Sequence, residues 1–154
     1  MISEPLSTDL GVLAEMYEEF HLLRCRTDPH VYCPPFEDSY YFNELSNILL
    51  YSNDEMIICV DEETDFIKGF AVFGMREFSS PIWRKRIVCK IDMILVRRGS
   101  EDSGADGEMV EYIKTYAAQN DCSSIEYAVP ADNTALCDNS GFEPIGINME
   151  IKIK

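Results

Sequence analysis

The sequence predicts one α/β domain built on a mixed β-sheet, and three observations lead to this prediction. The chain has 154 residues, of which 46% are hydrophobic, so it is long and apolar enough to bury one core. Two helical apolar patterns come first, and three strand-like runs joined by short connections follow them. A further helical pattern separates these runs from another strand. With no repeat, linker or low-complexity tract, we expect residues 1–154 to form a single domain.

Two helices are expected in the N-terminal third. The first begins at Thr8 and Asp9 and ends before Pro29, because the residue before a proline is pushed out of the helical region. Its apolar side chains share one face: Leu10, Leu13, Ala14, Tyr17, Phe20 and Leu23. The second helix is expected over residues 38–52. Its apolar stripe is Tyr41, Leu45, Ile48 and Leu49.

The rest of the chain alternates between strand and helix signals. Short apolar runs with period-2 alternation indicate strands, and apolar residues every three or four positions indicate helices. The expected elements are strands over 56–60, 67–75 and 87–96, a helix over 108–119, a strand over 124–129, a short helix over 133–139 and a last strand over 147–153.

Charge excludes several classes of function. The chain has 28 acidic and 13 basic side chains, a net charge of −15. General nucleic-acid binding needs clustered Lys and Arg to neutralise phosphates, so we do not expect it. Adsorption to an anionic membrane is disfavoured for the same reason. No apolar run reaches the roughly 18–20 residues of a membrane span, and the first residues lack the pattern of a secretory signal. A cationic partner or substrate stays open.

The charge is also unevenly distributed. Residues 1–65 hold 15 carboxylates against Arg24 and Arg26, whereas residues 84–98 are basic. The bases of the second segment are Arg84, Lys85, Arg86, Lys90, Arg97 and Arg98. Two interpretations are open: the two regions pair within one domain, or they are docking surfaces for other protein subunits.

Six cysteines occur singly, at positions 25, 33, 59, 89, 122 and 137. Isolated cysteines in apolar runs indicate reduced thiols, so we expect a cytoplasmic protein. Cys25, His30 and Cys33 lack a fourth ligand and the usual spacing, and we therefore predict no metal site.

The order of elements and the C-terminal motif resemble the GNAT superfamily, the Gcn5-related N-acetyltransferases, over nearly the whole chain. The residues that carry the resemblance are two helices before a hairpin, the strand 91–96, the loop and helix up to 119, the strand 125–129, Asp132-Asn133 and the ending 139–144, Asn-Ser-Gly-Phe-Glu-Pro. The resemblance implies a mixed, mostly antiparallel sheet that is splayed between its fourth and fifth strands and flanked by about four helices. It also implies acetyl-coenzyme A as the cofactor of an active member, bound in the splay.

The cofactor contacts that the resemblance implies lie on the fourth strand, the following loop and the C-terminal segment: Leu95, Val96, Gly104, Ala105, Gly107 and Asn133. The family's loop binds pyrophosphate through free backbone N–H groups at a helix start, with the pattern Arg/Gln-x-x-Gly-x-Gly/Ala. In the aligned residues 101–106 only Gly104 matches; Glu101 replaces the basic or amide residue and Asp106 replaces the last small one.

Residues 99–108 carry four carboxylates and no base, which predicts weak cofactor binding. The alternative is that these side chains point outward while the backbone still holds phosphate, or that Arg97 and Arg98 fold back onto the loop. The carboxylates counted here are Glu101, Asp102, Asp106 and Glu108.

Two candidate catalytic residues follow from the resemblance. Cys137 stands where the family often has a tyrosine that protonates the leaving thiolate, and it acts as that acid or simply packs. Asp92 lies on the strand expected over 87–96, which corresponds to the family's fourth strand, and it is a candidate general base. Period-2 alternation places it on the same face as Lys90, Ile94 and Val96. The alternative for Asp92 is an ion pair with a neighbouring Lys or Arg. Neither His21 nor His30 is expected at the site.

Three functional hypotheses remain. The first is a degenerate GNAT-fold protein with little or no acetyl transfer, which works as an interaction or assembly protein, as some phage-encoded and virion-associated members do; it would lie in the host cytoplasm or the virion. The second is an acetyl-coenzyme A-dependent N-acetyltransferase acting on a cationic amine. The third is an acidic protein that imitates nucleic acid.

Overall fold

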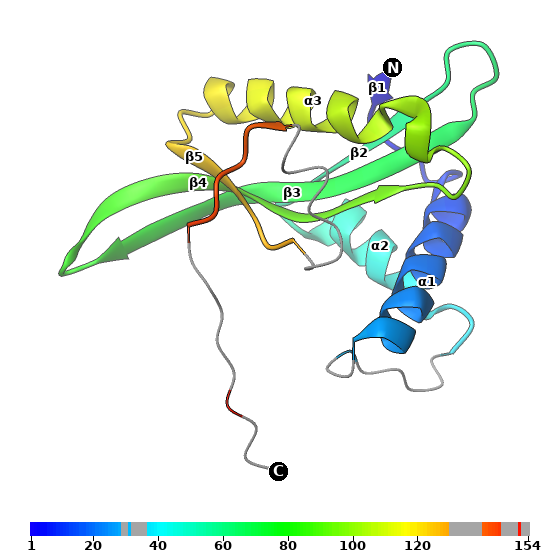
Figure 1. The fold of residues 1–154 in the computed structure, drawn as a ribbon, viewed down its shortest axis with the longest axis horizontal. Helices are drawn as coiled ribbons and strands as arrows, with labels where there is room; N and C mark the ends of the chain where they lie inside the picture. The colour runs from blue at the N-terminus through cyan, green and yellow to red at the C-terminus, as the bar shows by residue number, and fades with distance from the viewer. Residues whose placement is uncertain (29–30, 32–36, 130–139, 146–150, 152–154) are drawn as a thin grey trace.

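The computed structural model describes residues 1–28, 31, 37–129, 140–145 and 151 (Figure 1). Its elements in chain order are β1 (Ile2–Ser3), α1 (Leu10–Thr27), α2 (Tyr40–Tyr51), β2 (Glu55–Val60), β3 (Ile67–Ser80), β4 (Trp83–Val96), a 3₁₀ turn (Glu101–Ser103), α3 (Ala105–Gln119) and β5 (Ser124–Tyr127). The expected short helix over 133–139 and the core of the last strand over 147–153 lie outside the described residues.

The five strands form one sheet in the order β1-β2-β3-β4-β5. Neighbours from β1 to β4 are antiparallel, whereas β4 and β5 are parallel, so the predicted mixed sheet is confirmed. The parallel ladder runs from the pair Val88–Ser124 to the pair Ile91–Tyr127. Because β4 continues to Val96, its last five residues extend past the described part of β5.

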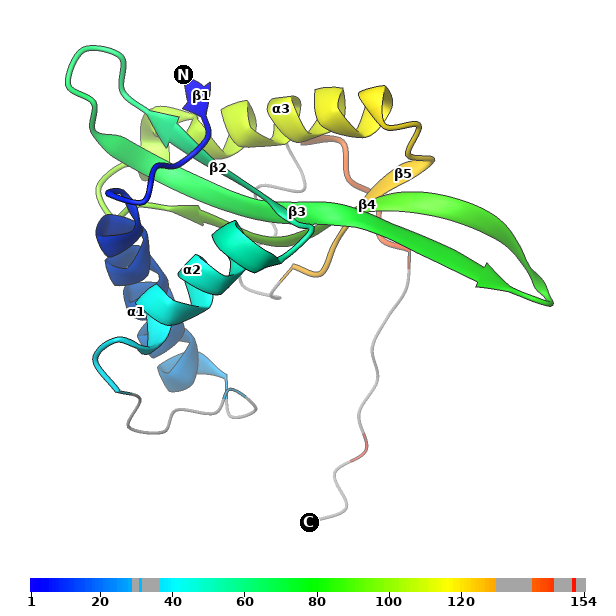
Figure 2. The same cartoon turned by 180° about the vertical axis from the view of Figure 1, so that it is seen from behind.

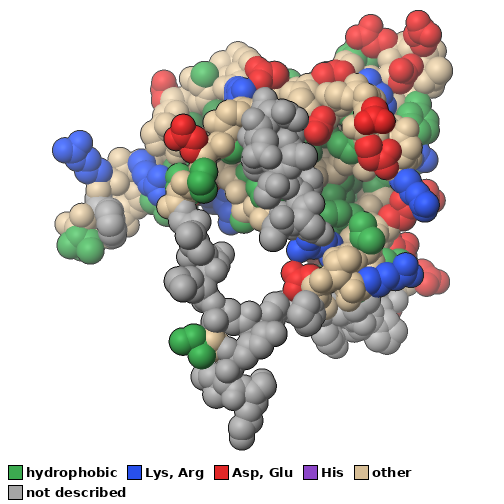
Figure 3. Space-filling model, viewed as in Figure 1, with side chains coloured by type: hydrophobic (Ala, Val, Ile, Leu, Met, Phe, Trp, Pro, Cys, Tyr) green, Lys and Arg blue, Asp and Glu red, His purple; other side chains and the backbone are tan. Residues whose placement is uncertain are grey.

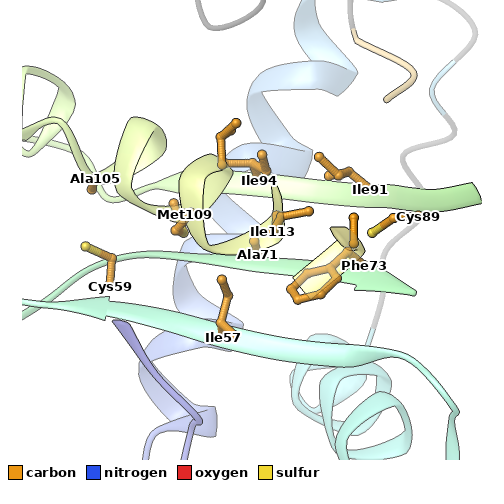
Figure 4. Close-up of a cluster of buried hydrophobic side chains, with 12 residues drawn as sticks. Ile57, Cys59, Ala71, Phe73, Cys89, Ile91, Ile94, Ala105, Met109 and Ile113 are labelled. Carbon is orange, nitrogen blue, oxygen red and sulfur yellow. The ribbon is translucent and has the colours of Figure 1, made fainter. Parts of the chain in front are cut away.

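Helices cover both faces of this sheet, α3 on one side and α1 with α2 on the other (Figures 1 and 2). Under α3, fully buried Phe73, Met109 and Ile113 belong to a cluster that β2, β3, β4 and α3 build together (Figure 4). On the opposite face, Leu13 and Leu45 pack against a second cluster from β2 and β3. Apolar burial on both faces is the main favourable term for a three-layer domain of this kind.

Four elements differ from the sequence prediction. β1 was not expected, β3 and β4 form a longer hairpin than predicted, and α3 begins at Ala105 rather than 108. Gly104 explains the early start of α3, because its φ of 73° lies in the left-handed region that glycine adopts without strain. The backbone therefore turns into the helix directly after the 3₁₀ turn.

A β-bulge at Asp92 interrupts the alternation of β4. Val72 pairs with Met93 and Phe73 pairs with Ile91, which leaves Asp92 as an extra residue between them. As a result Ile91 and Ile94 both pack under α3, while Met93 packs on the α1 side.

The expectation that Asp92 shares a face with Ile94 and Val96 is therefore wrong. Strict period-2 alternation does not hold across the bulge. Among the described residues, no helix is long and apolar enough to cross a membrane.

Candidate functional site

A cavity of about 260 Å³ lies where the pairing of β4 and β5 ends. Its walls come from α1, from β4 after the bulge and from the end of β5. The lining includes Tyr17, Phe20, His21, Asp92, Leu95 and Tyr127. The cavity thus lies between the ends of β4 and β5, where the resemblance implies that the cofactor of an active member would bind.

Asp92 lines this cavity, and it is also part of an ion-pair cluster. Its Oδ2 accepts a hydrogen bond from Nη2 of Arg76 at 3.1 Å, and its Oδ1 lies 4.0 Å from Nζ of Lys90. Arg76 in turn holds both oxygens of Asp54, at 2.7 and 3.3 Å, and this hydrogen bond to Asp54 raises the pKa of Arg76. The ion-pair interpretation of Asp92 is the one that the structure shows.

Gly74 makes this cluster possible. A Cβ at Gly74 would overlap the carboxylate of Asp54, so the aspartate rests on bare backbone while it meets Arg76.

His21 lines the cavity, contrary to the sequence expectation. Its Nδ1 lies 2.7 Å from the hydroxyl oxygen of Tyr41 on α2, and the two rings meet edge to face. The signal was present in the sequence: Tyr17, His21 and Arg24 follow the i, i+4, i+7 spacing of one helix face. The stronger apolar stripe of α1 indicates only the face of the helix that packs on the core.

The loop before α3 uses its own carboxylates to bind its backbone. Gly99 N–H donates to Oε2 of Glu101 at 2.8 Å, and Gly107 N–H donates to Oδ1 of Asp106 at 2.8 Å. The first N–H groups of a helix have no partner within the helix, and in a phosphate site they would point at the anion. Here a carboxylate occupies one such donor in the first turn of α3.

Glu108 points elsewhere. Its Oε2 accepts a hydrogen bond from the N-terminal amine of Met1 at 3.1 Å, and Lys68 lies 3.7 Å from the other oxygen. The thiol of Cys59 also donates to Oε2 of Glu108, at 3.6 Å. The hydrogen bond from the N-terminus is the main reason why the pKa of Glu108 is lowered. Three of the four carboxylates, Glu101, Asp102 and Asp106, therefore still contribute negative charge at the loop before α3.

The fold-back of Arg97 onto the loop is not what the structure shows. Its guanidinium lies 4.4 Å from the centre of the Phe66 ring, a cation–π contact on the other side of the strand end. Leu95 is buried and reaches the cavity, Val96 is half-buried, and Gly104, Ala105 and Gly107 all lie at the start of α3. Cys137 and Asn133 lie outside the described residues. Within the described chain, no group of three or more His, Cys, Asp or Glu is arranged to hold a metal ion.

Comparison with solved structures decides the fold. A mutant of the BH1408 protein from Bacillus halodurans matches with a TM-score of 0.88 and 17% identity over 100% of this chain and 99% of that one. AAC(6')-Iy, solved with a coenzyme A bisubstrate analogue, matches with a TM-score of 0.72 and 14% identity over 100% and 97% of the two chains. The chain has a GNAT fold.

Glucosamine-6-phosphate N-acetyltransferase from Arabidopsis thaliana, with a TM-score of 0.70, 11% identity and 100% and 98% coverage, shares this GNAT fold. No protein-family model matches the sequence, and no curated protein matches it at sequence level. At these identities the likeness covers the arrangement of strands and helices. What the site does must come from its own residues.

Proposed function

We propose that this chain is a GNAT-fold protein with weak or no acetyl-coenzyme A binding and little acetyl transfer, which works through contact with other protein subunits. The observation that carries the proposal is the loop before α3, where Glu101 and Asp106 accept hydrogen bonds from the loop's own N–H groups. A pyrophosphate at this helix start would have to displace a carboxylate and lie beside others.

The electrostatic cost supports this proposal. Two unit charges of like sign 4 Å apart repel by about 1 kcal/mol in water and about 4 kcal/mol near a protein surface. Glu101 and Asp102 are exposed and Asp106 is half-buried, so the cost per contact lies toward the lower of these figures. Two or three such contacts are comparable to the difference between micromolar and millimolar affinity, about 4 kcal/mol.

The ion pairs of Asp92 support the second half of the proposal. A general base in an N-acetyltransferase has to accept a proton from the attacking amine. Asp92 instead shares its two oxygens between Arg76 and Lys90. We therefore expect slow turnover even where cofactor is present. An assembly role in a host cytoplasm or a virion is the setting that we propose for such a protein.

Calorimetric titration with acetyl-coenzyme A tests the proposal. The wild-type chain should bind with a dissociation constant of about 1 mM or weaker, and Glu101→Arg combined with Asp106→Gly should bind at least tenfold more tightly. Glu111→Arg is the matched control, because it makes the same charge change as Glu101→Arg on an exposed turn of α3 away from the loop. Low-micromolar binding by the wild-type chain at physiological salt would refute the proposal.

A second candidate is an N-acetyltransferase that acts on a cationic amine. The cavity favours it, because His21 and Asp92 lie together there with Tyr17 and Tyr127. Release of free coenzyme A thiol from acetyl-coenzyme A in the presence of a polyamine would support this function. The wild-type chain would then have to lose that turnover on His21→Ala or Asp92→Asn.

A further inference from the structure

The hairpin of β3 and β4 extends beyond the rest of the sheet. Pairing with β2 ends at Phe73, and pairing with β5 begins at Val88. Within the hairpin Arg76 pairs with Val88 and Glu77 with Ile87, so residues 77–87, which we name the basic arm, pair only with each other among the described strands. Figures 1 and 2 show the arm projecting away from all three helices. An isolated two-stranded hairpin is marginally stable in water. We therefore expect the arm to be stabilised by contact with another molecule.

The arm has the composition of an interface. It holds three bases and one acid, a balance of +2 on a chain of −15. Its exposed apolar side chains include Phe78 and Ile82, and Ile82 at the turn is 84% exposed. Apolar and aromatic side chains flanked by arginine are typical of the binding surfaces of proteins.

Part of this positive charge is available to a partner. Lys85 pairs with Glu77 across the hairpin at 3.2 Å, and both side chains are more than half exposed. Arg86 pairs with Glu126 and covers the ring of Phe78. For Arg84, the described residues offer no carboxylate within 4 Å. Among the described residues, the bases of the arm form no ion pair with α1 or α2. Pairing of the arm with the acidic N-terminal helices within one domain is therefore not seen.

The opposite end of the same two strands is acidic. We name as the acidic end the carboxylates of the β2–β3 loop and of the loop after β4, all exposed except the half-buried Asp61: Asp61, Glu62, Glu63, Asp65, Glu101 and Asp102. Figure 3 shows carboxylates gathered at its upper right, over the β2–β3 loop, and Lys and Arg on the arm at its left. β3 has 14 residues, so the two ends lie roughly 43 Å apart, several Debye lengths at physiological salt.

We propose that the basic arm of one copy docks on the acidic end of a second copy, in a head-to-tail arrangement. Charge complementarity selects this partner: the acidic end of the chain gathers six carboxylates, an excess over the neighbouring Arg97 and Arg98. A contact between two arms is disfavoured, because it would bring like charges together. Heterologous contacts of this kind extend into open assemblies that grow with concentration.

This inference rests on the proposed function in one respect. Glu101 and Asp102, which disfavour pyrophosphate at the helix start, would instead attract the arginine and lysine side chains of the neighbouring arm. The loop would thus have exchanged a phosphate site for a protein contact.

Sedimentation velocity at about 20 mM and about 500 mM salt tests the arrangement, since the Debye length falls from roughly 20 Å to about 4 Å. The wild-type chain should associate at low salt in a concentration-dependent way and dissociate at high salt. Arg84→Glu with Lys85→Glu should weaken association at least tenfold. Glu62→Lys with Glu63→Lys should do the same. Glu111→Lys, a charge reversal on the exposed face of α3, is the control and should leave association unchanged.

Mixing the two reversed variants gives the decisive measurement. Each should be monomeric alone, whereas the mixture should associate, because the acidic arm of one now meets the reversed end of the other. A wild-type chain that stays monomeric at low salt overturns the inference, as does association that neither variant weakens. The titration with acetyl-coenzyme A is independent: tight cofactor binding by a self-associating chain would overturn the proposed function alone, and a monomer that binds no cofactor would overturn this inference alone.

Discussion

Gly69 lies where β3 passes the end of β4, and alanine at this position should destabilise the fold. An added Cβ would lie 2.7 Å from the carbonyl oxygen of Leu95 and 3.0 Å from Cε of Met109. The methionine end is flexible, but the carbonyl belongs to a paired strand, since Gly69 is opposite Val96 in the ladder. Overpacking that forces backbone to move costs about 1–3 kcal/mol, and we expect Gly69→Ala to fall within that range.

Urea denaturation followed by circular dichroism measures the effect. Gly11→Ala is the matched control, because nothing lies within 4 Å of its Cβ and the residue is in the first turns of α1. Alanine there should stabilise by up to about 1 kcal/mol through helix propensity and lower unfolded-state entropy. A Gly69→Ala chain that unfolds within about 0.5 kcal/mol of wild type would refute the steric argument, and the close approach of β3 to Leu95 with it.

Three further predictions follow from the ion pairs and thiols. Glu108→Gln should lower the free energy of unfolding by about 0.5 kcal/mol at neutral pH, since the pair with the Met1 amine is largely exposed. Because the folded pKa of Glu108 is lowered, this stability is present above the unfolded pKa of about 4.3 and is lost as pH falls through the folded pKa. The urea midpoints of the two chains should therefore converge in acid. Asp54→Asn should cost about 1–2 kcal/mol by thermal or urea unfolding, because it weakens a half-buried bidentate pair with Arg76. Burial raises the pKa of Cys89 to about 11, so its thiol should resist a disulfide reagent at pH 8 until the chain is unfolded; fast labelling in the native state would contradict this.

The helices and most of the strands could be predicted because their apolar spacing is regular. α1 and α2 begin and end within two residues of the expected positions, and the mixed sheet follows from the order of helices and strands. The arm was missed because Ser79, Ser80 and Pro81 are typical of the end of a strand, whereas in the structure β3 continues through Ser80 and the chain turns only at Pro81 and Ile82. Residues that face solvent on both sides of a ribbon leave no apolar alternation to find.

The bulge at Asp92 could not be predicted, for a different reason. The run from Ile91 to Leu95 is apolar on both sides of the aspartate, so the sequence is compatible with either face of the sheet. Register is decided by the partners on β3, which supply Val72 and Phe73 on opposite faces. Only the paired structure places Asp92 against Arg76 and in the cavity.

For the loop before α3, the sequence predicted the excess of carboxylates but not their contacts. Whether a carboxylate faces a phosphate site depends on what else lies within reach. Glu108 accepts a hydrogen bond from the N-terminal amine, which β1 places beside it, and Glu101 accepts one from the backbone N–H of Gly99. The first contact joins residues 107 positions apart and has no local signal.

The cavity and the loop carry different weight as evidence for catalysis. The cavity follows from the sheet itself: a strand that bulges at Asp92 and a parallel neighbour that stops pairing at Tyr127 leave a gap whatever chemistry the chain performs. The phosphate site depends instead on a few side chains at one helix start, and two of them, Glu101 and Asp106, belong to neither core cluster. A GNAT fold can therefore lose its cofactor while it keeps both its stability and its cavity. For this reason the carboxylates of Glu101 and Asp106 decide the proposed function, and the retained cavity does not.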